Sequence, residues 1–109
     1  DALWGHRRNP QGYAEEIERF DVKLGEFLSA MREDDLPIIT ADHGNADHAK
    51  NEDGTPNTAH SLNPVPFVYI SDNLDAKLED GILADVAPSL CHILGIEQPA
   101  EMTGRSLIK

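Results

Sequence analysis

The sequence predicts an α/β fold with a mostly parallel sheet, on the basis of three observations. Residues 37–40 (PIIT) form a short β-branched run, and residues 65–70 (VPFVYI) form a second apolar run. Apolar stripes with helical spacing lie before the first run and after the second. Short, continuously apolar runs are typical of strands that are buried on both faces, as strands of parallel sheets are.

The first helix is predicted over residues 10–33. Asn9 and Pro10 are typical of a helix cap followed by the first helical residue. Apolar residues then recur at steps of three and four, which indicates an amphipathic helix with one face in the core. These residues are Tyr13, Ala14, Ile17, Phe20, Leu24, Phe27, Leu28 and Met31.

The second helix is predicted over residues 82–94, with Gly95 placed to end it in a left-handed cap. Its apolar positions are Ile82, Leu83, Val86, Ala87, Leu90, Ile93 and Leu94. Residues 46–63 form a polar connection without periodicity, and such a length indicates function or disorder. Residues 74–80 are expected to form an irregular acidic link or an edge excursion, and residues 97–109 an irregular tail.

Length and charge restrict the class of protein. A chain of 109 residues is one domain at most and is small for a complete α/β enzyme, so we expect residues 1–109 to be a single, partial catalytic domain. The start at Asp1, without a methionine, favours a fragment or an engineered piece. A net charge of −11 argues against nucleic acid or an anionic membrane as partner. The lone Cys91 cannot form an internal disulfide, which is compatible with a reducing, cytoplasmic location.

Asp42 and His43 directly follow the first predicted strand. Neighbouring side chains on a strand point to opposite faces, so both can reach one site only if the strand has ended, and Gly44 permits such a turn. Open α/β sheets bind their ligands at the carboxyl ends of parallel strands. The sequence therefore leaves two interpretations open here, a ligand site or a polar loop with an incidental histidine.

Five candidate metal ligands lie in three predicted loops. They are Asp1, His6, Asp42, His43 and His60. Mixed carboxylate and imidazole ligands suit Mn²⁺ or Zn²⁺. Because five ligands exceed what one ion needs from a protein, the economical interpretation is a two-metal cluster, which can stabilise the attacking and leaving oxygens of a phosphoryl group.

Four motifs carry a resemblance to cofactor-independent phosphoglycerate mutase over residues 37–109. They are TADHGN (40–45), TAHSLNPVPF (58–67), GILADVAPSLCHILGIEQ (81–98) and PAEMTGRSL (99–107). Residues 1–21 (DALWGHRRNPQGYAEEIERFD) instead resemble phosphopentomutase, because the aspartate and histidine are five positions apart. Both families belong to the alkaline phosphatase superfamily.

The resemblance implies the C-terminal part of an alkaline-phosphatase-like three-layer domain. It implies two divalent ions, Mn²⁺ first and Zn²⁺ as the alternative. Asp1, His6 and His60 resemble the ligands of one ion, and Asp42 and His43 resemble ligands of the other. The implied reaction acts on a small phosphorylated substrate and interconverts 3-phosphoglycerate and 2-phosphoglycerate through a phosphoenzyme.

Other residues receive no role in this chemistry. The family's serine or threonine nucleophile matches no position here, so no catalytic or substrate-binding residue is assigned. Thr40, Thr58 and Ser61 are expected to make loop hydrogen bonds, and His48 and His92 are expected at the surface or in packing. Cys91 is expected to be a packed thiol.

Three alternatives remain open on the sequence. One is phosphopentomutase activity, which exchanges phosphate between C1 and C5 of ribose. Another is a metal-binding fragment, or a chimera of the two families, without turnover. The third is a structural α/β remnant. The oligomeric state stays open as well.

Overall fold

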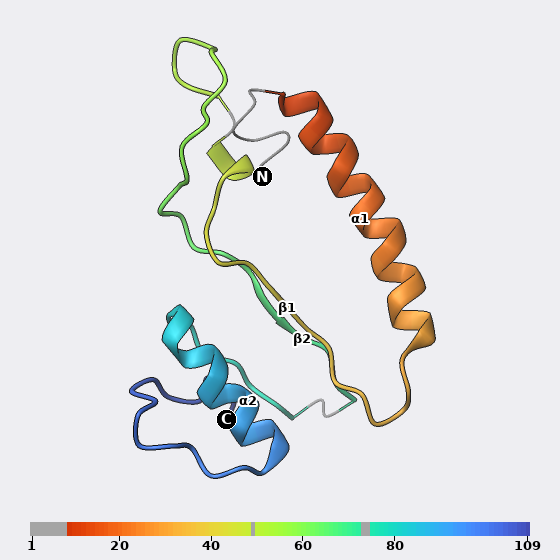
Figure 1. Cartoon of the computed structure of the whole chain (residues 1–109), viewed down its shortest axis with the longest axis vertical. Helices are drawn as coiled ribbons and strands as arrows, with labels where there is room; N and C mark the ends of the chain where they lie inside the picture. Colours follow the sequence, from red (N-terminus) through yellow and green to blue (C-terminus); the bar gives the residue numbers. More distant parts are fainter. Residues whose placement is uncertain (1–8, 49, 73–74) are drawn as a thin grey trace. The chain divides into compact units, whose positions relative to one another are not determined.

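The computed structural model describes residues 9–48, 50–72 and 75–109 (Figure 1). It divides the chain into two compact units, Asp1–Ile70 and Ser71–Lys109, and each is described by itself. The elements follow the order α1 (Pro10–Ala30), β1 (Ile38–Thr40), the 3₁₀ turn η1 (Ala46–His48), β2 (Phe67–Tyr69), the 3₁₀ turn η2 (Leu83–Asp85) and α2 (Val86–Leu94).

Helix α1 begins as the sequence predicts. Asn9 is its N-cap, and its side-chain oxygen accepts a hydrogen bond from the backbone N–H of Gly12 at 2.9 Å. Pro10 occupies the first turn, where its missing N–H leaves no partner unsatisfied. The helix ends at Ala30 and not at residue 33, because Met31 already has an extended backbone (φ −68°, ψ 149°).

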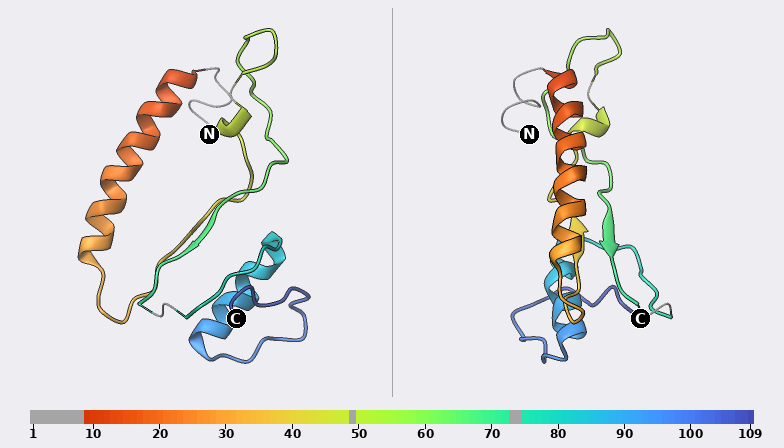
Figure 2. Two further views of the ribbon diagram at one scale, coloured as in Figure 1. Left: turned by 180° about the vertical axis from the view of Figure 1, so that it is seen from behind. Right: turned by 90° about the vertical axis from the view of Figure 1, so that its right-hand side faces the viewer.

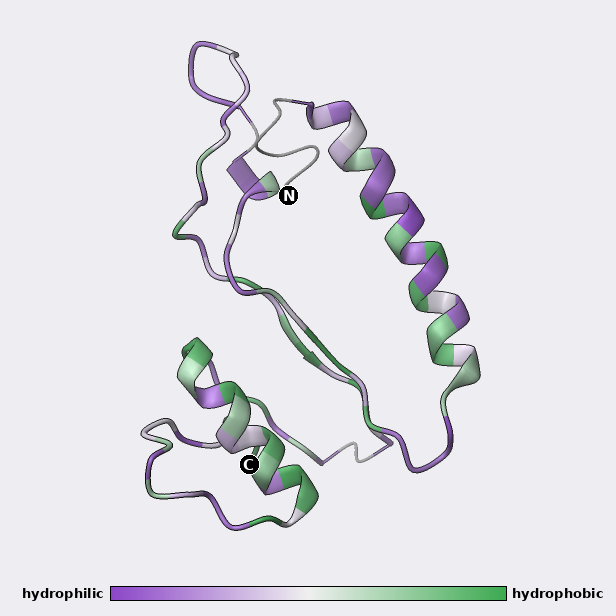
Figure 3. Cartoon of the chain, in the orientation of Figure 1, coloured by the Kyte–Doolittle hydropathy of each residue, from purple (hydrophilic) through white to green (hydrophobic). Residues whose placement is uncertain are grey.

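The apolar stripe of α1 is exposed, so its predicted role as core is wrong within this structure. Ile17, Phe20 and Phe27 are 56%, 55% and 60% exposed, and Gly12 is the one buried residue of the helix. Apolar and polar residues alternate along the helix (Figure 3), which is straight in both views of Figure 2. No helix in the described part of the chain is both long and apolar enough to cross a membrane.

Strands β1 and β2 lie side by side and run antiparallel, with Ile38 opposite Tyr69 and Thr40 opposite Phe67 (Figure 1). Both strands lie within predicted runs, but the predicted parallel pairing is wrong for this pair. A parallel pair needs a crossover, usually a helix, between its strands. The described part of the connection at residues 41–66 contains only the short turn η1, and it returns the chain beside β1.

The second unit contains the second predicted helix. Turn η2 and helix α2 together cover residues 83–94 and confirm the prediction for 82–94. Gly95 ends α2 in the left-handed region (φ 65°, ψ 27°), as expected, and donates its N–H to the carbonyl of His92 at 3.2 Å. Glycine carries no Cβ, so it adopts this conformation at little cost.

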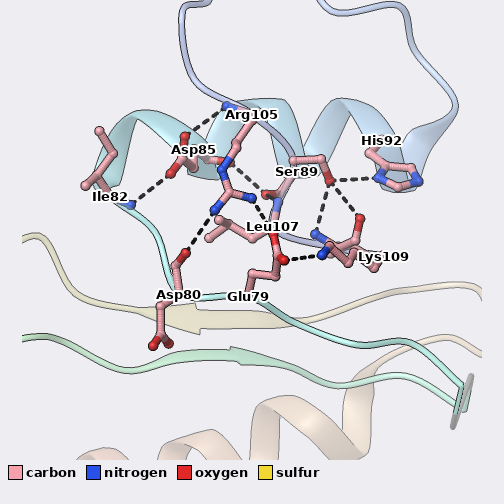
Figure 4. Close-up of polar contacts among 11 residues, drawn as sticks. Glu79, Asp80, Ile82, Asp85, Ser89, His92, Arg105, Leu107 and Lys109 are labelled. Carbon is pink, nitrogen blue, oxygen red and sulfur yellow. Dashed lines mark hydrogen bonds and ion pairs between the residues drawn. The ribbon is translucent and has the colours of Figure 1, made fainter.

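A buried polar network fixes α2 to the C-terminal residues (Figure 4). The Asp85 carboxylate accepts the backbone N–H groups of Ile82 and Arg105, each at 2.9 Å. Ser89 Oγ donates to the Asp85 carbonyl at 2.7 Å and accepts the Leu107 N–H at 2.9 Å. Although residues 97–109 form no helix or strand, these bonds hold part of that tail firmly.

The predicted acidic link at residues 74–80 includes an edge pairing. Leu78 forms an antiparallel bridge with Ile108, and the Glu79 N–H donates to the Leu107 carbonyl at 2.9 Å. The Glu79 carboxylate also pairs with the side chains of Arg105 and Lys109, which lower its pKa (Figure 4).

Candidate metal site

Two of the predicted ligands, His43 and His60, lie in direct contact. His43 is in the loop that leaves β1, and His60 is in the loop that leads to β2. Their imidazole rings stack, with 3.6 Å between the ring centroids and 15° between the ring planes. Residues separated by a long polar connection are therefore brought to one place.

Backbone pairing of the two loops explains this contact. Gly44 and Ser61, each of which follows one of the histidines, form an antiparallel bridge, and the Ser61 N–H donates to the Gly44 carbonyl at 2.8 Å. The adjacent Asn45 is buried, with 7% of its surface exposed, and donates its amide to the Ala59 carbonyl at 3.2 Å. The two loops are thus also paired beyond the regular strands, through an isolated bridge whose register differs from that of β1 and β2 by two residues.

Asp42 lies beside His43. Its Oδ1 is 3.7 Å from Nε2 of His43, and its side chain is 85% exposed. The other ring nitrogen of His43, Nδ1, is 3.3 Å from the Gly44 carbonyl. Asp42, His43 and His60 together offer one carboxylate and two imidazoles, a donor set that suits Mn²⁺ or Zn²⁺.

The predicted set of five ligands remains a prediction. Asp1 and His6 lie outside the described residues, so their relation to His60 is not observed. Within residues 9–48, 50–72 and 75–109, no group of three or more His, Cys, Asp or Glu side chains is arranged to hold a metal ion.

Sequence reasoning missed Asp47, which ties the two loops together from η1. Its Oδ2 accepts hydrogen bonds from Ser61 Oγ at 2.6 Å and Asn63 Nδ2 at 2.5 Å. These two bonds lower the pKa of the Asp47 carboxyl, which is therefore ionised at neutral pH. The prediction that Ser61 makes a loop hydrogen bond is confirmed. An acidic residue four positions after His43 and a hydroxyl directly after His60 were the available signals.

The other two described histidines, His48 and His92, bond to other residues. His48 is exposed in η1, and its carbonyl accepts the Asn57 amide at 2.9 Å. His92 lies in the second unit, with Nδ1 2.7 Å from Ser106 Oγ. These positions agree with the expectation of surface or packing histidines.

Imidazole and carboxylate side chains are the ligands that metal-dependent enzymes use for Zn²⁺ and Mn²⁺. Residues 1–98 match the family model of the Metalloenzyme superfamily, and the chain belongs to this superfamily.

The individual relatives are phosphomutases. The chain is similar to the 2,3-bisphosphoglycerate-independent phosphoglycerate mutases of Parabacteroides distasonis (61% identity) and Bacteroides thetaiotaomicron (52%), each over 106 residues, 96% of this chain and 21% of the mutase. It is also similar to the phosphopentomutase of Clostridium beijerinckii, with 42% identity over 114 residues, 99% of this chain and 26% of that enzyme. The chain thus spans about a fifth to a quarter of the length of these curated relatives.

The comparisons confirm both resemblances seen in the motifs. The match to the Parabacteroides distasonis mutase covers 96% of the chain and must include most of residues 1–21. One mutase therefore matches both the opening and the rest of the chain, so the two-part resemblance does not require a chimera.

Proposed function

We propose that this chain is part of the catalytic domain of a phosphoglycerate mutase that interconverts 3-phosphoglycerate and 2-phosphoglycerate. The observation that carries the proposal is the stacked pair His43 and His60, held at the loop junction beyond β1 and β2. The names of the two relatives at 61% and 52% identity support this substrate. A small phosphorylated substrate, together with the lone Cys91, favours a cytoplasmic location.

The imidazole and carboxylate side chains present are residue types that suit divalent ions. In this proposal Asp1, His6 and His60 hold one ion, and Asp42 and His43 contribute to the other, with Mn²⁺ preferred over Zn²⁺. When bound, such ions stabilise the negative charge that develops on the oxygens of a transferred phosphoryl group.

The chain's own contribution is to hold ligands in place before the substrate arrives. The Gly44–Ser61 bridge fixes the backbone beside each histidine, so little motion is needed when a ligand binds. The proposed route passes through a phosphoenzyme. Its serine or threonine nucleophile has no match in this chain, so we assign no residue here to that step.

Phosphopentomutase activity is the second candidate. The five-position separation of Asp1 and His6 and the 42% identity to the Clostridium beijerinckii enzyme favour it. The same metal ligands would serve either reaction, so the substrate must be decided by experiment.

A segment exchange tests the proposal and separates the two substrates. The matching segment of the Parabacteroides distasonis mutase is replaced by this chain, and the hybrid is assayed with Mn²⁺ for 3-phosphoglycerate isomerisation. The corresponding hybrid of the Clostridium beijerinckii phosphopentomutase is assayed with ribose 1-phosphate. We expect turnover in the first hybrid and none in the second, because the segment must pack against the rest of its host and is 61% identical to the first enzyme but 42% identical to the second.

Two substitutions in the active hybrid test the proposed site, one at a proposed ligand and one as its matched control. His60→Ala should abolish turnover because it removes a proposed ligand, whereas His48→Ala, which changes an exposed histidine, should preserve it. Turnover only in the pentomutase hybrid would replace the proposed substrate with ribose phosphate. Turnover that survives His60→Ala would reject the proposed site.

A further inference from the structure

Asp47 joins the loop after β1 to the loop before β2 through side chains alone. Ser61 Oγ and Asn63 Nδ2 both donate to Asp47 Oδ2, at 2.6 and 2.5 Å. These contacts cross 14 and 16 positions of the chain, so they are tertiary contacts and not local turns. The Ser61 hydroxyl also accepts the backbone N–H of Asn63 at 3.4 Å. Asp47 therefore restrains the backbone directly after His60.

Gly44 lies directly against this junction, on the side of His43. A Cβ built at position 44 would collide with Ser61 Oγ and would lie 2.7 Å from Asp47 Oδ1. Gly44 is itself buried, and its carbonyl accepts the Ser61 N–H at 2.8 Å. Ser61 is thus held twice, through its backbone by Gly44 and through its hydroxyl by Asp47.

The register of the bridge explains why this junction controls the histidines. With Gly44 opposite Ser61, position 43 lies opposite position 62 and diagonal to position 60. Diagonal positions of an antiparallel pair share one face, and aromatic side chains can bridge the distance between them. A slip by one residue would turn one histidine to the other face. The bridge therefore brings the two histidines near one another, and their rings stack there.

We propose that Asp47, acting through Ser61, is a positioning residue that holds His43 and His60 in the arrangement required for metal binding. The metal part of this inference rests on the proposed function, whereas the part that concerns the loops does not. Groups that orient ligands without touching the ion typically change metal affinity by about 10–100-fold when they are removed.

The first test needs no metal. Nuclear Overhauser contacts between the ring protons of His43 and His60 are recorded in the 109-residue chain. We expect Asp47→Ala to abolish them. Asp47→Asn should retain them, because its side-chain carbonyl oxygen can still accept from Ser61. This rescue by the conservative variant distinguishes a positioning hydrogen bond from a general need for the carboxylate charge.

Asp53 offers a matched control in the same connection. Its Oδ1 accepts from the N–H and the hydroxyl of Thr55, at 2.9 and 2.6 Å, within an exposed turn. Asp53→Ala therefore removes two similar hydrogen bonds without touching the junction, and it should leave the histidine contacts intact. Cross-strand contacts between Ile39 and Val68 report whether the strand pair survives each substitution.

The second test uses Mn²⁺ alone as probe. We expect Asp47→Ala to weaken Mn²⁺ binding about 10–100-fold, and Asp47→Asn and Asp53→Ala to change it little. If Asp47→Ala disrupts the strand pair, Ser61→Ala replaces it, because it removes the same bond from the other side. Whichever of these two variants keeps β1 and β2 paired must lose the nuclear Overhauser contacts between His43 and His60.

Two results would separate the inference from the proposed function. Histidine contacts that persist in both Asp47→Ala and Ser61→Ala would overturn the positioning role. An unsubstituted chain that keeps the contacts but binds no Mn²⁺ would count against the proposed function, while the metal-free test would still decide the role of Asp47.

Discussion

Ser89 and Leu107 are joined by a buried hydrogen bond between helix α2 and the C-terminal residues. The Leu107 N–H donates to Ser89 Oγ at 2.9 Å, and the same hydroxyl donates to the Asp85 carbonyl at 2.7 Å. Ser89 is 0% and Leu107 4% exposed. Water has no access to these groups, so loss of the hydroxyl would leave them without a replacement partner.

Ser89→Ala should therefore destabilise the second unit by about 1–3 kcal/mol, the usual cost of a buried group left unsatisfied. The measurement is the hydrogen-exchange protection of the Leu107 amide. Ser29→Ala is the matched control, because Ser29 Oγ makes the same kind of bond, to the Gly25 carbonyl at 2.9 Å, on an exposed helix. The control should change stability by no more than about 0.5 kcal/mol. Equal effects of both substitutions would contradict the prediction.

Asp85 should make the second unit sensitive to acid. The backbone N–H groups of Ile82 and Arg105 lower the pKa of its carboxyl below the ordinary value of 3.8. A lowered pKa in the folded state means that the stabilisation is complete above pH 3.8 and is lost as the pH falls through the folded-state pKa. Urea unfolding followed from neutral pH into this range should show the loss.

Asp85→Asn is the comparison for this titration. Its amide has one acceptor oxygen, so one of the two N–H groups loses its partner and neutral-pH stability should fall. The remaining stability should vary less with pH below 3.8 than that of the unsubstituted chain. If the stability of both proteins falls equally as the pH is lowered, the acid sensitivity comes from other carboxyl groups.

Two glycines should respond to alanine in opposite ways. Gly44→Ala places a methyl group against Ser61 Oγ and Asp47, so we expect the loop junction to open and the stack of His43 and His60 to be lost. Nuclear Overhauser contacts between the two rings measure this.

Gly25→Ala is the control for Gly44→Ala. It lies in the middle of α1 with no atom within 4 Å of an added Cβ. Alanine is a better helix former than glycine by about 1 kcal/mol, so the substitution should raise the thermal stability of α1. Loss of helicity in Gly25→Ala, or an intact junction in Gly44→Ala, would contradict the structure.

Local signals allowed the start of α1 and the end of α2 to be predicted from the sequence. Asn9 caps α1 because its side chain reaches the N–H three residues on, and Gly95 ends α2 because glycine tolerates a positive φ. Both effects depend only on neighbouring residues. The strand positions were found for the same reason, since the apolar runs themselves mark them.

Tertiary relationships were less predictable. The apolar run at residues 65–70 does not say which direction its partner strand takes, and the pair is antiparallel. The spacing of Ile17, Phe20 and Phe27 predicts a helix with one apolar face but not what that face contacts, and here it is exposed. Asp47 was missed because its role depends entirely on contacts 14 and 16 positions away.

The proposed metal ligands can be tested in the 109-residue chain by calorimetric titration with Mn²⁺. We expect two sites of unequal affinity, the weaker one at Asp42 and His43, for which fewer ligands were identified in the sequence. His60→Ala should weaken the stronger site by more than about 100-fold, because removal of a ligand costs more than removal of a group that only orients one. His43→Ala should affect the weaker site.

His48→Ala is the matched control for these ligand substitutions, since it removes an imidazole that lies on the exposed turn η1. It should leave both affinities unchanged.

The stacking of His43 and His60 adds one further expectation, because each ring restricts the motion of the other. Each ligand substitution should therefore weaken the other site as well, and the double variant should lose less affinity than the sum of the single losses in free energy. Strictly additive losses would show that the two rings act independently despite their contact, and equal losses in His48→Ala would show that the chain binds Mn²⁺ without a specific site.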